Sequence, residues 1–236
     1  MKIGIIIPAG GQSKRFNGIY KPFLKINGKT IIEIIIEKFF LVPEVVKIVI
    51  PVNKKYLNPF TKIINSQFEK HISKIKIIPG GKERQFSVFS AFTELMKNDT
   101  IDTVVIHDAV RPFVDLKLLT SLLSQIKNCN AVIPVKPVTE TVKYVNGNFV
   151  KDTLDRTKLF LSLTPQVFKK KILEYAYKRI DLNKYTITDE ARLLELVNMK
   201  VKAVLYKGYN IKITYPGDYE LVKLLFNSPV SLLPIS

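Results

Sequence analysis

The 236-residue sequence has no tryptophan, two histidines and a single cysteine, Cys129. A lone cysteine cannot form an internal disulfide, and two histidines with one thiol hardly supply the ligands of a zinc site. Disulfides are typical of secreted proteins, so their exclusion favours the reducing cytoplasm as the location. We expect Cys129 to be a small, buried packing residue.

Long hydrophobic runs are also missing. The apolar run at residues 3–7 is too short for the core of a signal peptide, and no cleavage site of small residues follows it. No stretch approaches the ~20 apolar residues that a membrane-spanning helix requires. With 47% hydrophobic and 24% charged residues, the composition is that of a folded globular protein that is neither secreted nor embedded in a membrane.

Acidic residues are scarce, because 20 Asp and Glu stand against 37 Lys and Arg and leave a formal charge of +17. Nucleic-acid binders and enzymes for polyanionic substrates both carry such a charge. Six of the basic residues are arginines, and the lysines are scattered among abundant Ile, Asn and Tyr, a bias that an AT-rich genome produces without functional cause. A nucleic-acid binder predicts basic stripes with interleaved aromatics, whereas the motif cations here stand singly in loops. We expect no nucleic-acid partner.

Short apolar runs of strand length alternate with longer segments of helical periodicity. This alternation predicts βα units around a largely parallel sheet. The expected strands are 3–8, 45–52, 74–78, 103–107, 131–135, 201–205 and 210–214. The expected helices are 30–40, 57–69, 84–97, 116–126, 168–179, 188–196 and 216–226. The length suits one α/β domain covering residues 1–236.

The alternation breaks at residues 137–153. Two short runs of β character, 143–145 and 149–151, flank the turn signal Asn146-Gly147-Asn148. Asn-Gly supplies the positive φ angles that a tight β-hairpin turn needs. The hairpin is poorly placed to join the main sheet, so we expect it to project as an arm.

The loop after the first expected strand reads Pro8-Ala9-Gly10-Gly11-Gln12-Ser13-Lys14-Arg15-Phe16. Backbone amides at its glycines can approach a phosphate chain closely, and Arg15 and Lys21 add positive charge beside it. It is not a P-loop: the tempting Gly28-Lys29-Thr30 has Phe23 where that motif requires glycine. Taken alone, the loop is equally consistent with an ordinary βα turn carrying two solvated cations.

Further polar clusters follow the later expected strands, and one lies on the last expected strand. They are Pro-Gly-Gly-Lys-Glu-Arg-Gln at 79–85, His-Asp-Ala-Val-Arg-Pro at 107–112, Thr-Glu-Thr-Val-Lys at 139–143 and Asn-Ile-Lys-Ile-Thr at 210–214. In an open α/β sheet, ligands bind at the edge where the strands end. Several clusters rich in guanidinium and ammonium groups therefore predict an anion-binding site.

Read in order, these motifs resemble the 2-C-methyl-D-erythritol 4-phosphate cytidylyltransferase family of the non-mevalonate isoprenoid pathway. The resemblance runs from Ile3 to about Leu225 and also includes the stretches Thr-Leu-Asp-Arg at 153–156, Thr-Pro-Gln-Val-Phe at 164–168 and Ile-Thr-Asp-Glu-Ala at 187–191. It implies a three-layer, Rossmann-like nucleotide-diphospho-sugar transferase fold with a mostly parallel, twisted sheet.

The resemblance also implies the reaction. The phosphate of methylerythritol phosphate would attack the α-phosphorus of CTP and release pyrophosphate, with Mg²⁺ held mainly by the CTP phosphates rather than by protein ligands. Such a transfer needs positioning and charge neutralisation, because the nucleophile is already an anion. Four cations would be catalytic: Arg15 and Lys21 at the triphosphate, and Arg156 and Lys212 at the substrate phosphate. The implied CTP pocket consists of Ala9, Gly10, Gly11, Gly81, Lys82 and Ser87. The implied substrate side consists of Asp108, Arg111, Thr141, Thr164, Thr188 and Thr214.

In this family the arm mediates dimerisation and completes the partner's site. Thr141 and Arg156 lie in or beside the arm here, so the resemblance implies a homodimer with shared active sites. From the residues alone, Arg156 could instead form a surface ion pair, and Thr188 is equally suited to cap a helix. The chain departs from the family pattern at Ser13, Phe86 and Glu140.

Two enzymatic or structural alternatives share this scaffold. A cytidylyltransferase for ribitol phosphate or another polyol phosphate would have several of the same motifs, although the arginine-bearing stretches at 80–84 and 153–156 favour methylerythritol phosphate. An inactive member of the fold would share them too, but retention of the four cations named above speaks against it.

Overall fold

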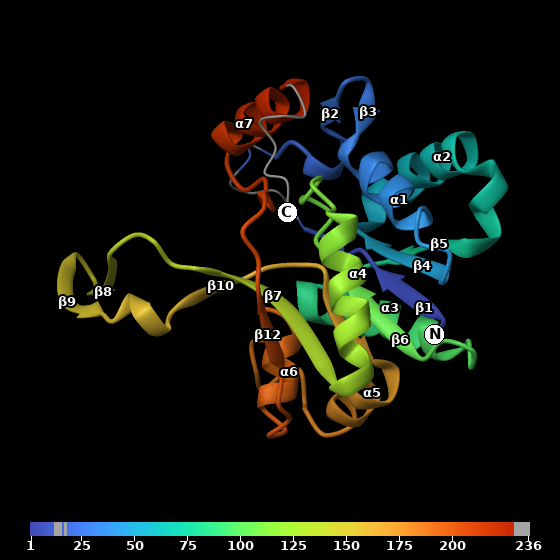
Figure 1. The fold of residues 1–236 in the computed structure, drawn as a ribbon. Coiled ribbons are helices and arrows are strands. Elements are labelled where there is room, and N and C mark those ends of the chain that lie inside the picture. The colour runs from blue at the N-terminus through green and yellow to red at the C-terminus, as the bar shows by residue number, and fades with distance from the viewer. Residues whose placement is uncertain (12–15, 17, 229–236) are drawn as a thin grey trace.

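The computed structural model describes residues 1–11, 16 and 18–228, in which one sheet is covered by helices on both faces (Figure 1). Its strands, in sequence order, are β1 (Ile3–Ile6), β4 (Val45–Val52), β5 (Ile75–Pro79), β6 (Thr103–Ile106), β7 (Ala131–Pro137), β10 (Phe160–Ser162), β11 (Gln166–Lys169) and β12 (Lys202–Leu205). The spatial order is β10-β7-β11-β6-β1-β4-β5, with β12 also paired to β7. Pairings among β6, β1, β4 and β5 and between β12 and β7 are parallel, whereas β10 and β11 run antiparallel to their neighbours.

Side chains of the central strands alternate between two hydrophobic layers. Ile5 packs in the layer that contains Phe39, while its neighbour Ile6 packs in the layer that contains Val88. The first layer lies under α1 (Ile31–Phe40), α2 (Leu57–Gln67), α4 (Leu116–Gln125) and α7 (Pro216–Asn227), and the second under α3 (Arg84–Met96), α5 (Lys170–Tyr177) and α6 (Glu190–Glu195). Strands buried on both faces are typical of parallel α/β sheets, so the expected three-layer fold is confirmed.

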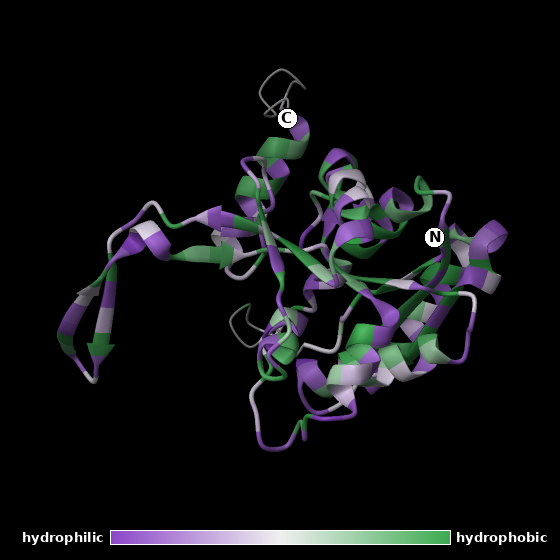
Figure 2. Cartoon of the chain, turned by 60° about the horizontal axis from the view of Figure 1, so that its bottom comes forward, coloured by the Kyte–Doolittle hydropathy of each residue, from purple (hydrophilic) through white to green (hydrophobic). Residues whose placement is uncertain are grey.

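The expected hairpin forms a separate two-stranded sheet that projects from the body of the protein (Figures 1 and 2). It consists of β8 (Val142–Asn146) and β9 (Phe149–Leu154), joined by a turn in which Gly147 has a φ of 59°. Glycine accepts such an angle without steric cost, so the Asn-Gly signal identified the turn correctly. A second small hairpin, β2 (Lys25–Ile26) with β3 (Lys29–Thr30), has no counterpart in the sequence-based prediction.

The structure differs from the sequence-based secondary structure in several places. Residues 210–214 form no strand, because the segment is held across the loop after β6 by a bond from the Ile213 N–H to the Val110 carbonyl. The helix predicted at 168–179 begins at Lys170, because residues 166–169 form β11 between β6 and β7. The short strand β10 was not predicted, and α6 is capped by Asp189 rather than by Thr188.

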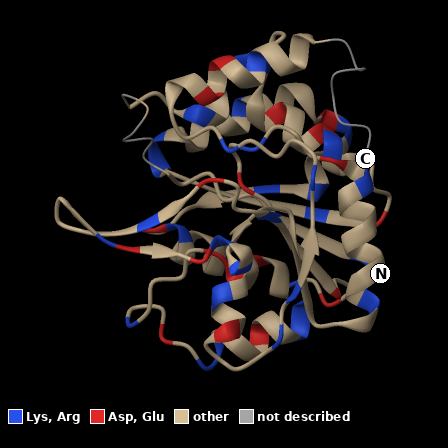
Figure 3. Ribbon diagram, turned by 60° about the vertical axis from the view of Figure 1, so that its left-hand side comes forward, with Lys and Arg blue, Asp and Glu red and all other residues tan. Residues whose placement is uncertain are grey.

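Among the described residues, no helix could span a membrane, and the basic residues are spread over many elements (Figure 3). None of the helices within residues 1–11, 16 and 18–228 has the length and apolar character needed to cross a membrane. Lys and Arg are scattered among helices, strands and loops (Figure 3). Cys129 is partly buried against the first hydrophobic layer, close to its expected role as a packing residue.

Candidate active site

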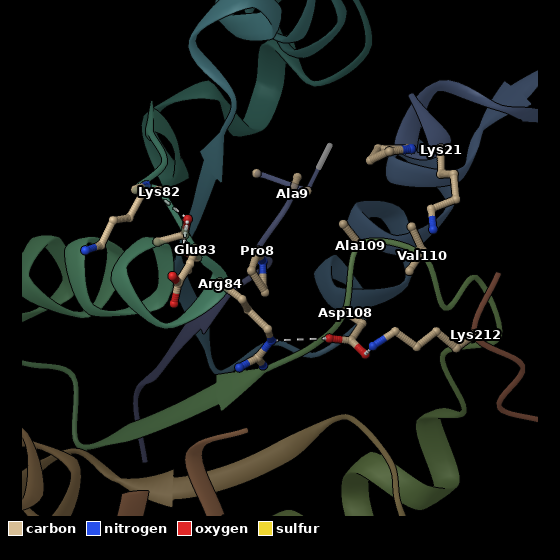
Figure 4. A pocket seen from close by; sticks show the side chains of 15 residues that line it. Pro8, Ala9, Lys21, Lys82, Glu83, Arg84, Asp108, Ala109, Val110 and Lys212 are labelled. Atoms are coloured by element: carbon tan, nitrogen blue, oxygen red, sulfur yellow. Dashed lines mark hydrogen bonds and ion pairs between the residues drawn. The ribbon is translucent and has the colours of Figure 1, made fainter. Parts of the chain in front are cut away.

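A cavity of about 520 Å³ opens where β1, β5 and β6 end (Figure 4). Its volume falls within the range of about 300–1,000 Å³ that is typical of small-ligand sites. The lining residues are Pro8, Ala9, Gly10, Gly11, Lys21, Pro22, Gly81, Lys82, Glu83, Arg84, Ser87, Asp108, Ala109, Val110 and Lys212. Because parallel strands end at one edge of the sheet, motifs far apart in the sequence converge here.

The loop after β1 presents its backbone to the cavity. The Ala9 N–H donates to a backbone carbonyl of β4 at 2.9 Å, and the Tyr20 hydroxyl donates to the Ala9 carbonyl. These two bonds hold the loop in place, and Gly10 and Gly11 line the cavity directly after it. The three residues therefore lie where a nucleotide-binding loop was expected. Arg15, expected to be catalytic, lies outside the described residues.

The loop after β5 forms a second backbone wall. The Ser87 hydroxyl accepts from the Gly81 N–H at 3.0 Å and donates to the Glu83 carbonyl at 3.0 Å, so one side chain folds the loop. A Cβ at Gly81 would lie 2.5 Å from the Cβ of Phe86, a distance that requires glycine here. Lys82 turns its side chain away from the cavity, with Nζ 4.7 Å from the centroid of the Phe86 ring, so it is mainly its backbone that faces a ligand (Figure 4).

Of the three expected catalytic cations that lie among the described residues, Lys21 and Lys212 reach the cavity. Lys21 begins the 3-10 helix η2 (Lys21–Phe23), and its side chain points toward the cavity (Figure 4). Lys212 enters from the segment before α7, and its Nζ lies 3.0 Å from Oδ2 of Asp108. The Lys212 side chain is 45% exposed, so the ammonium group is accessible to a bound anion.

Asp108 is the electrostatic centre of the cavity wall. Oδ2 accepts from Nε of Arg111 at 3.1 Å, and Oδ1 lies 3.8 Å from Nε of Arg84. Burial by itself raises the pKa of the Asp108 carboxyl, but the Lys212 and Arg84 cations lower it well below its usual value. The carboxylate is therefore ionised, and a set of cations surrounds it. Arg111 is buried, and it also donates to the Asn210 carbonyl at 2.7 Å, so it supports Asp108 from behind rather than lining the cavity.

His107 and Thr164 secure the same loop from inside the fold. The Arg111 carbonyl can only accept, so the 2.9 Å contact with Nε2 of His107 assigns a proton to that nitrogen. Nδ1 then accepts from the Thr164 hydroxyl at 3.1 Å, and that hydroxyl accepts from the Asp108 N–H at 3.2 Å. Complete burial lowers the pKa of His107 to about 4, so the ring is neutral at pH 7. The hydroxyl of Thr164, which was expected on the substrate side, is thus hydrogen-bonded to His107 and to the backbone of Asp108.

The arm keeps two expected site residues away from the cavity of their own chain. Thr141 and Arg156 are both exposed, and neither lines the cavity. Arg156 begins the 3-10 helix η6 (Arg156–Lys158) and donates to the Thr139 carbonyl within the arm, so the alternative of a surface ion pair does not describe this contact.

Two further threonines from the sequence-based set also lie outside the cavity lining. Thr188 is exposed and precedes Asp189, the residue whose side chain accepts from the Arg192 N–H at the start of α6. The Thr214 hydroxyl donates to the Lys212 carbonyl at 3.3 Å, so Thr214 contacts the backbone of Lys212 and does not line the cavity.

Arg84 is the main residue that the sequence-based site set lacks. Its guanidinium lines the cavity and makes paired contacts with the Glu190 carboxylate at 3.0 and 3.1 Å. The signal for Arg84 was present in the Gly-Gly-Lys-Glu-Arg motif, but its partner lies 106 residues away in the sequence. The other lining residues absent from that set are Pro8, Pro22, Glu83, Ala109 and Val110.

Fold and cavity together define a class of protein. A three-layer α/β sheet that gathers glycine loops, lysines and a buried carboxylate at its carboxyl edge is the arrangement of a Rossmann-like nucleotidyltransferase. Residues 3–228 match the family model described as IspD, 2-C-methyl-D-erythritol 4-phosphate cytidylyltransferase. The chain belongs to this family, and the resemblance inferred from the motifs is confirmed.

Relatives and solved structures agree with this assignment. The chain is 35% identical over 224 residues to a 2-C-methyl-D-erythritol 4-phosphate cytidylyltransferase of Clostridioides difficile, covering 94% of this chain and 93% of the relative. It is 38% identical to the protein of that name from Wigglesworthia glossinidia brevipalpis, covering 96% of each. The crystal structure of the Francisella tularensis 2-C-methyl-D-erythritol 4-phosphate cytidylyltransferase (IspD) superposes with a TM-score of 0.78 at 33% identity, covering 95% of this chain and 99% of that one. The enzyme class is therefore a cytidylyltransferase.

Proposed function

We propose that this chain transfers the cytidylyl group of CTP to 2-C-methyl-D-erythritol 4-phosphate, as its family does, to supply isoprenoid precursors. An oxygen of the substrate phosphate forms a bond to the α-phosphorus of CTP. The bond from that phosphorus to the bridging oxygen of the β-phosphate breaks, and pyrophosphate leaves with the electron pair. The observation that carries the proposal is the cavity itself, which has two glycine-containing backbone walls and is approached by Lys21 and Lys212.

The backbone walls suit the nucleotide. Ala9, Gly10 and Gly11 would meet the triphosphate with backbone amides, and Gly81 and Lys82 would contribute backbone to the cytosine side. The Ser87 hydroxyl fixes the second wall through its contact with the Gly81 N–H. Walls made of backbone lie close together, and this closeness favours a pyrimidine over a larger purine.

The cations suit the transferring phosphorus. Lys21, and by family resemblance Arg15, would stabilise negative charge on the triphosphate during attack. Lys212 would leave Asp108 to hold the substrate phosphate, an exchange that its 45% exposure permits. A side-chain base is not required, because the attacking phosphate oxygen is already ionised.

We further propose that CTP binds together with Mg²⁺. Mg²⁺ prefers oxygen ligands and is commonly held by one or two carboxylates together with substrate phosphates. Of the cavity carboxylates, Asp108 is already surrounded by cations and Glu83 is the other. These residues fit an ion carried chiefly by the CTP phosphates, where it would neutralise part of their charge.

The arm supports a second proposal, that the chain works as a homodimer in the cytoplasm. Large hydrophobic side chains are exposed along the hairpin, including Tyr144 at 58%, Phe149 at 74% and Val150 at 60%. Such a surface is costly in water unless a partner covers it. A second copy of the chain would cover the arm and bring Thr141 and Arg156 to the neighbouring cavity.

Pyrophosphate release from the purified chain tests the reaction. With CTP and Mg²⁺, we expect turnover on methylerythritol phosphate and none on ribitol 5-phosphate. Lys212→Ala should lower kcat by about 100-fold or more, the size typical of removing one charge-stabilising group. Lys223→Ala is the matched control, because Lys223 pairs with Glu220 on α7, away from the cavity lining. Turnover on ribitol phosphate alone would move the chain to another substrate, and silence on both would contradict the proposal.

A further inference from the structure

A buried carboxylate stands behind the cavity. Glu190, the first residue of α6, is 0% exposed, although glutamate is rarely buried without a charged partner. Its partner is Arg84, whose Nη1 and Nη2 donate to the two carboxylate oxygens at 3.0 and 3.1 Å. Burial raises the pKa of the Glu190 carboxyl, and the Arg84 guanidinium opposes that rise. This paired geometry fixes the orientation of the guanidinium plane as well as its position.

Arg84, whose guanidinium is fixed by Glu190, in turn contacts Asp108 in the cavity wall. Its Nε lies 3.8 Å from Oδ1 of Asp108, and the other oxygen of Asp108 contacts Nζ of Lys212 at 3.0 Å. Opposite charges therefore alternate from Glu190 through Arg84 and Asp108 to Lys212. The last three side chains of this row are visible in Figure 4.

We propose that Glu190 is a positioning residue for the substrate phosphate, an inference that rests on the function proposed above. By holding Arg84, it keeps one cation beside Asp108 that stays in place when Lys212 leaves for the phosphate. Asp108 then remains ionised and ordered between Arg84 and Arg111 while the lysine is engaged elsewhere.

Removal of the Glu190 charge changes the balance at Asp108. The Arg84 guanidinium would lose its paired carboxylate and turn toward the remaining negative groups, either Asp108 or a phosphate in the cavity. Both movements alter the position from which Lys212 meets the substrate phosphate. The two backbone walls depend on other contacts, those of Tyr20 with Ala9 and of Ser87 with Gly81, so CTP binding should change less.

A purely structural role is the competing explanation. A carboxylate in the first turn of a helix interacts favourably with the helix dipole, and a buried ion pair can anchor α6 to α3. Both structural effects, the interaction with the helix dipole and the anchoring of α6, predict that loss of Glu190 lowers stability and the folded fraction. Neither predicts a selective change in the KM of one substrate.

Steady-state kinetics on the full chain distinguish the positioning role of Glu190 from a purely structural one. Glu190→Gln keeps the size of the side chain and removes its charge, and Glu190→Asp keeps the charge on a shorter stem. We expect Glu190→Gln to raise the KM for methylerythritol phosphate by about 10- to 100-fold, the range typical of losing a partner that orients a binding residue. The KM for CTP should change by less than about threefold, and Glu190→Asp should recover part of the loss. Glu195→Gln is the matched control, because Glu195 lies on the same helix in an exposed pair with Arg192.

A double variant keeps the test decisive if Glu190→Gln folds poorly. Arg84→Gln with Glu190→Gln removes both charges of the ion pair, so the buried carboxylate is not left without its partner. If Glu190 acts through Arg84, adding Glu190→Gln to Arg84→Gln should not weaken methylerythritol phosphate binding further. Additive effects, equal changes in both KM values, or loss of folding in both variants would overturn the inference. An inactive wild type would overturn the proposed function with it, whereas an active wild type and an unchanged Glu190→Gln would overturn this inference alone.

Discussion

At the cavity, Asp108 is 8% exposed and contacts three cations of its own chain, whereas on the arm Phe149 is 74% exposed and every residue of β9 faces solvent. Both regions carry motifs of the same family, and both supply residues expected at the active site. The cavity side is held by contacts among several distant segments of one chain, such as those of Asp108 with Arg84 and Lys212. The arm is a separate two-stranded sheet, and neither Thr141 nor Arg156 lines the cavity described above.

The contrast indicates how the work of the site is divided. Buried, internally paired groups such as Asp108 and His107 give the cavity a fixed shape and a fixed pattern of charge. Exposed groups on the arm make their contacts within the arm, as Arg156 does with the Thr139 carbonyl. If a second copy provides that surface, assembly and substrate binding are coupled, because Arg156 would reach a cavity only in the dimer.

Mixing two inactive variants is the strongest test of this division. Lys212→Ala removes a cavity cation, and Arg156→Ala removes an arm cation. Each homodimer should lose about 100-fold or more in kcat, as expected for a charge-stabilising group of the transition state. In a random mixture, half of the dimers would be mixed and would hold one intact site each, so about a quarter of wild-type activity should return.

The control for mixing is Lys212→Ala combined with Lys212→Ala carrying a second tag, which exchanges subunits without restoring a site. Recovery in the mixed sample alone supports a shared site. If Arg156→Ala retains full activity, or if mixing restores nothing although subunits exchange, the arm does not complete the neighbouring cavity.

Loss of the Asp108 charge should lower the free energy of unfolding, because Asp108 pairs with three cations of its own chain. Asp108→Asn leaves Arg84, Arg111 and Lys212 crowded without their carboxylate, so the free energy of unfolding should fall by about 3 kcal/mol. The arm control Asp152→Asn alters an exposed side chain that bonds the adjacent Thr153 N–H, and should change stability by less than about 0.5 kcal/mol. Urea denaturation monitored by circular dichroism measures both. Equal losses in the two variants would show that the cavity charges contribute no special stability.

Much of this architecture could be predicted from the sequence, because its signals are local. The strand-end motifs carry Lys21, Asp108 and Lys212 to one edge once the sheet is parallel, and Asn146-Gly147 identifies the arm turn. Short buried segments were predicted less well. Residues 168 and 169 were predicted as the start of a helix, because a short apolar segment fits either structure, whereas they are the end of β11, whose antiparallel place between β6 and β7 is decided by tertiary pairing.

Long-range side-chain pairing could not be predicted at all. Glu190 carries no signal for Arg84, because an ion pair across 106 residues depends on how α3 and α6 pack. For the same reason Arg111 and Thr164 were expected to face substrate, yet they support Asp108 from inside. Residue type and motif indicated which loops form the site, and packing decided which side chains turn toward the cavity.

The pH dependence of stability should come from the cavity side. His107 has a pKa lowered to about 4 by burial, against about 6.5 in the unfolded chain, so the unfolded state binds the proton more readily between these values. Stability should therefore fall as the pH drops from 6.5 to 4, by roughly 3 kcal/mol in total. The lowered pKa of Asp108 adds a further loss below about pH 4. Urea midpoints measured from pH 7 to pH 4 give the slope.

His107→Gln should flatten this slope, because it removes the group that titrates between pH 6.5 and 4. The matched control is His71→Gln, which removes the other histidine, one that stacks on Phe40 away from the cavity. An unchanged slope in His107→Gln would assign the acid sensitivity to another part of the molecule.

The smallest effect should appear at the tip of the arm. Gly147 has a φ of 59°, which an alanine adopts at a cost of about 1 kcal/mol, so Gly147→Ala should loosen the turn. Because the hairpin forms its own sheet, global unfolding should be nearly unchanged, while amide exchange of β8 and β9 should quicken about fivefold. Gly217→Ala is the control, since Gly217 has an ordinary φ and nothing within 4 Å of an added Cβ. A fall in global stability equal to the local effect would mean that the arm and the body of the protein unfold as one unit. The contrast between a self-contained cavity and an independent arm would then hold for function but not for folding.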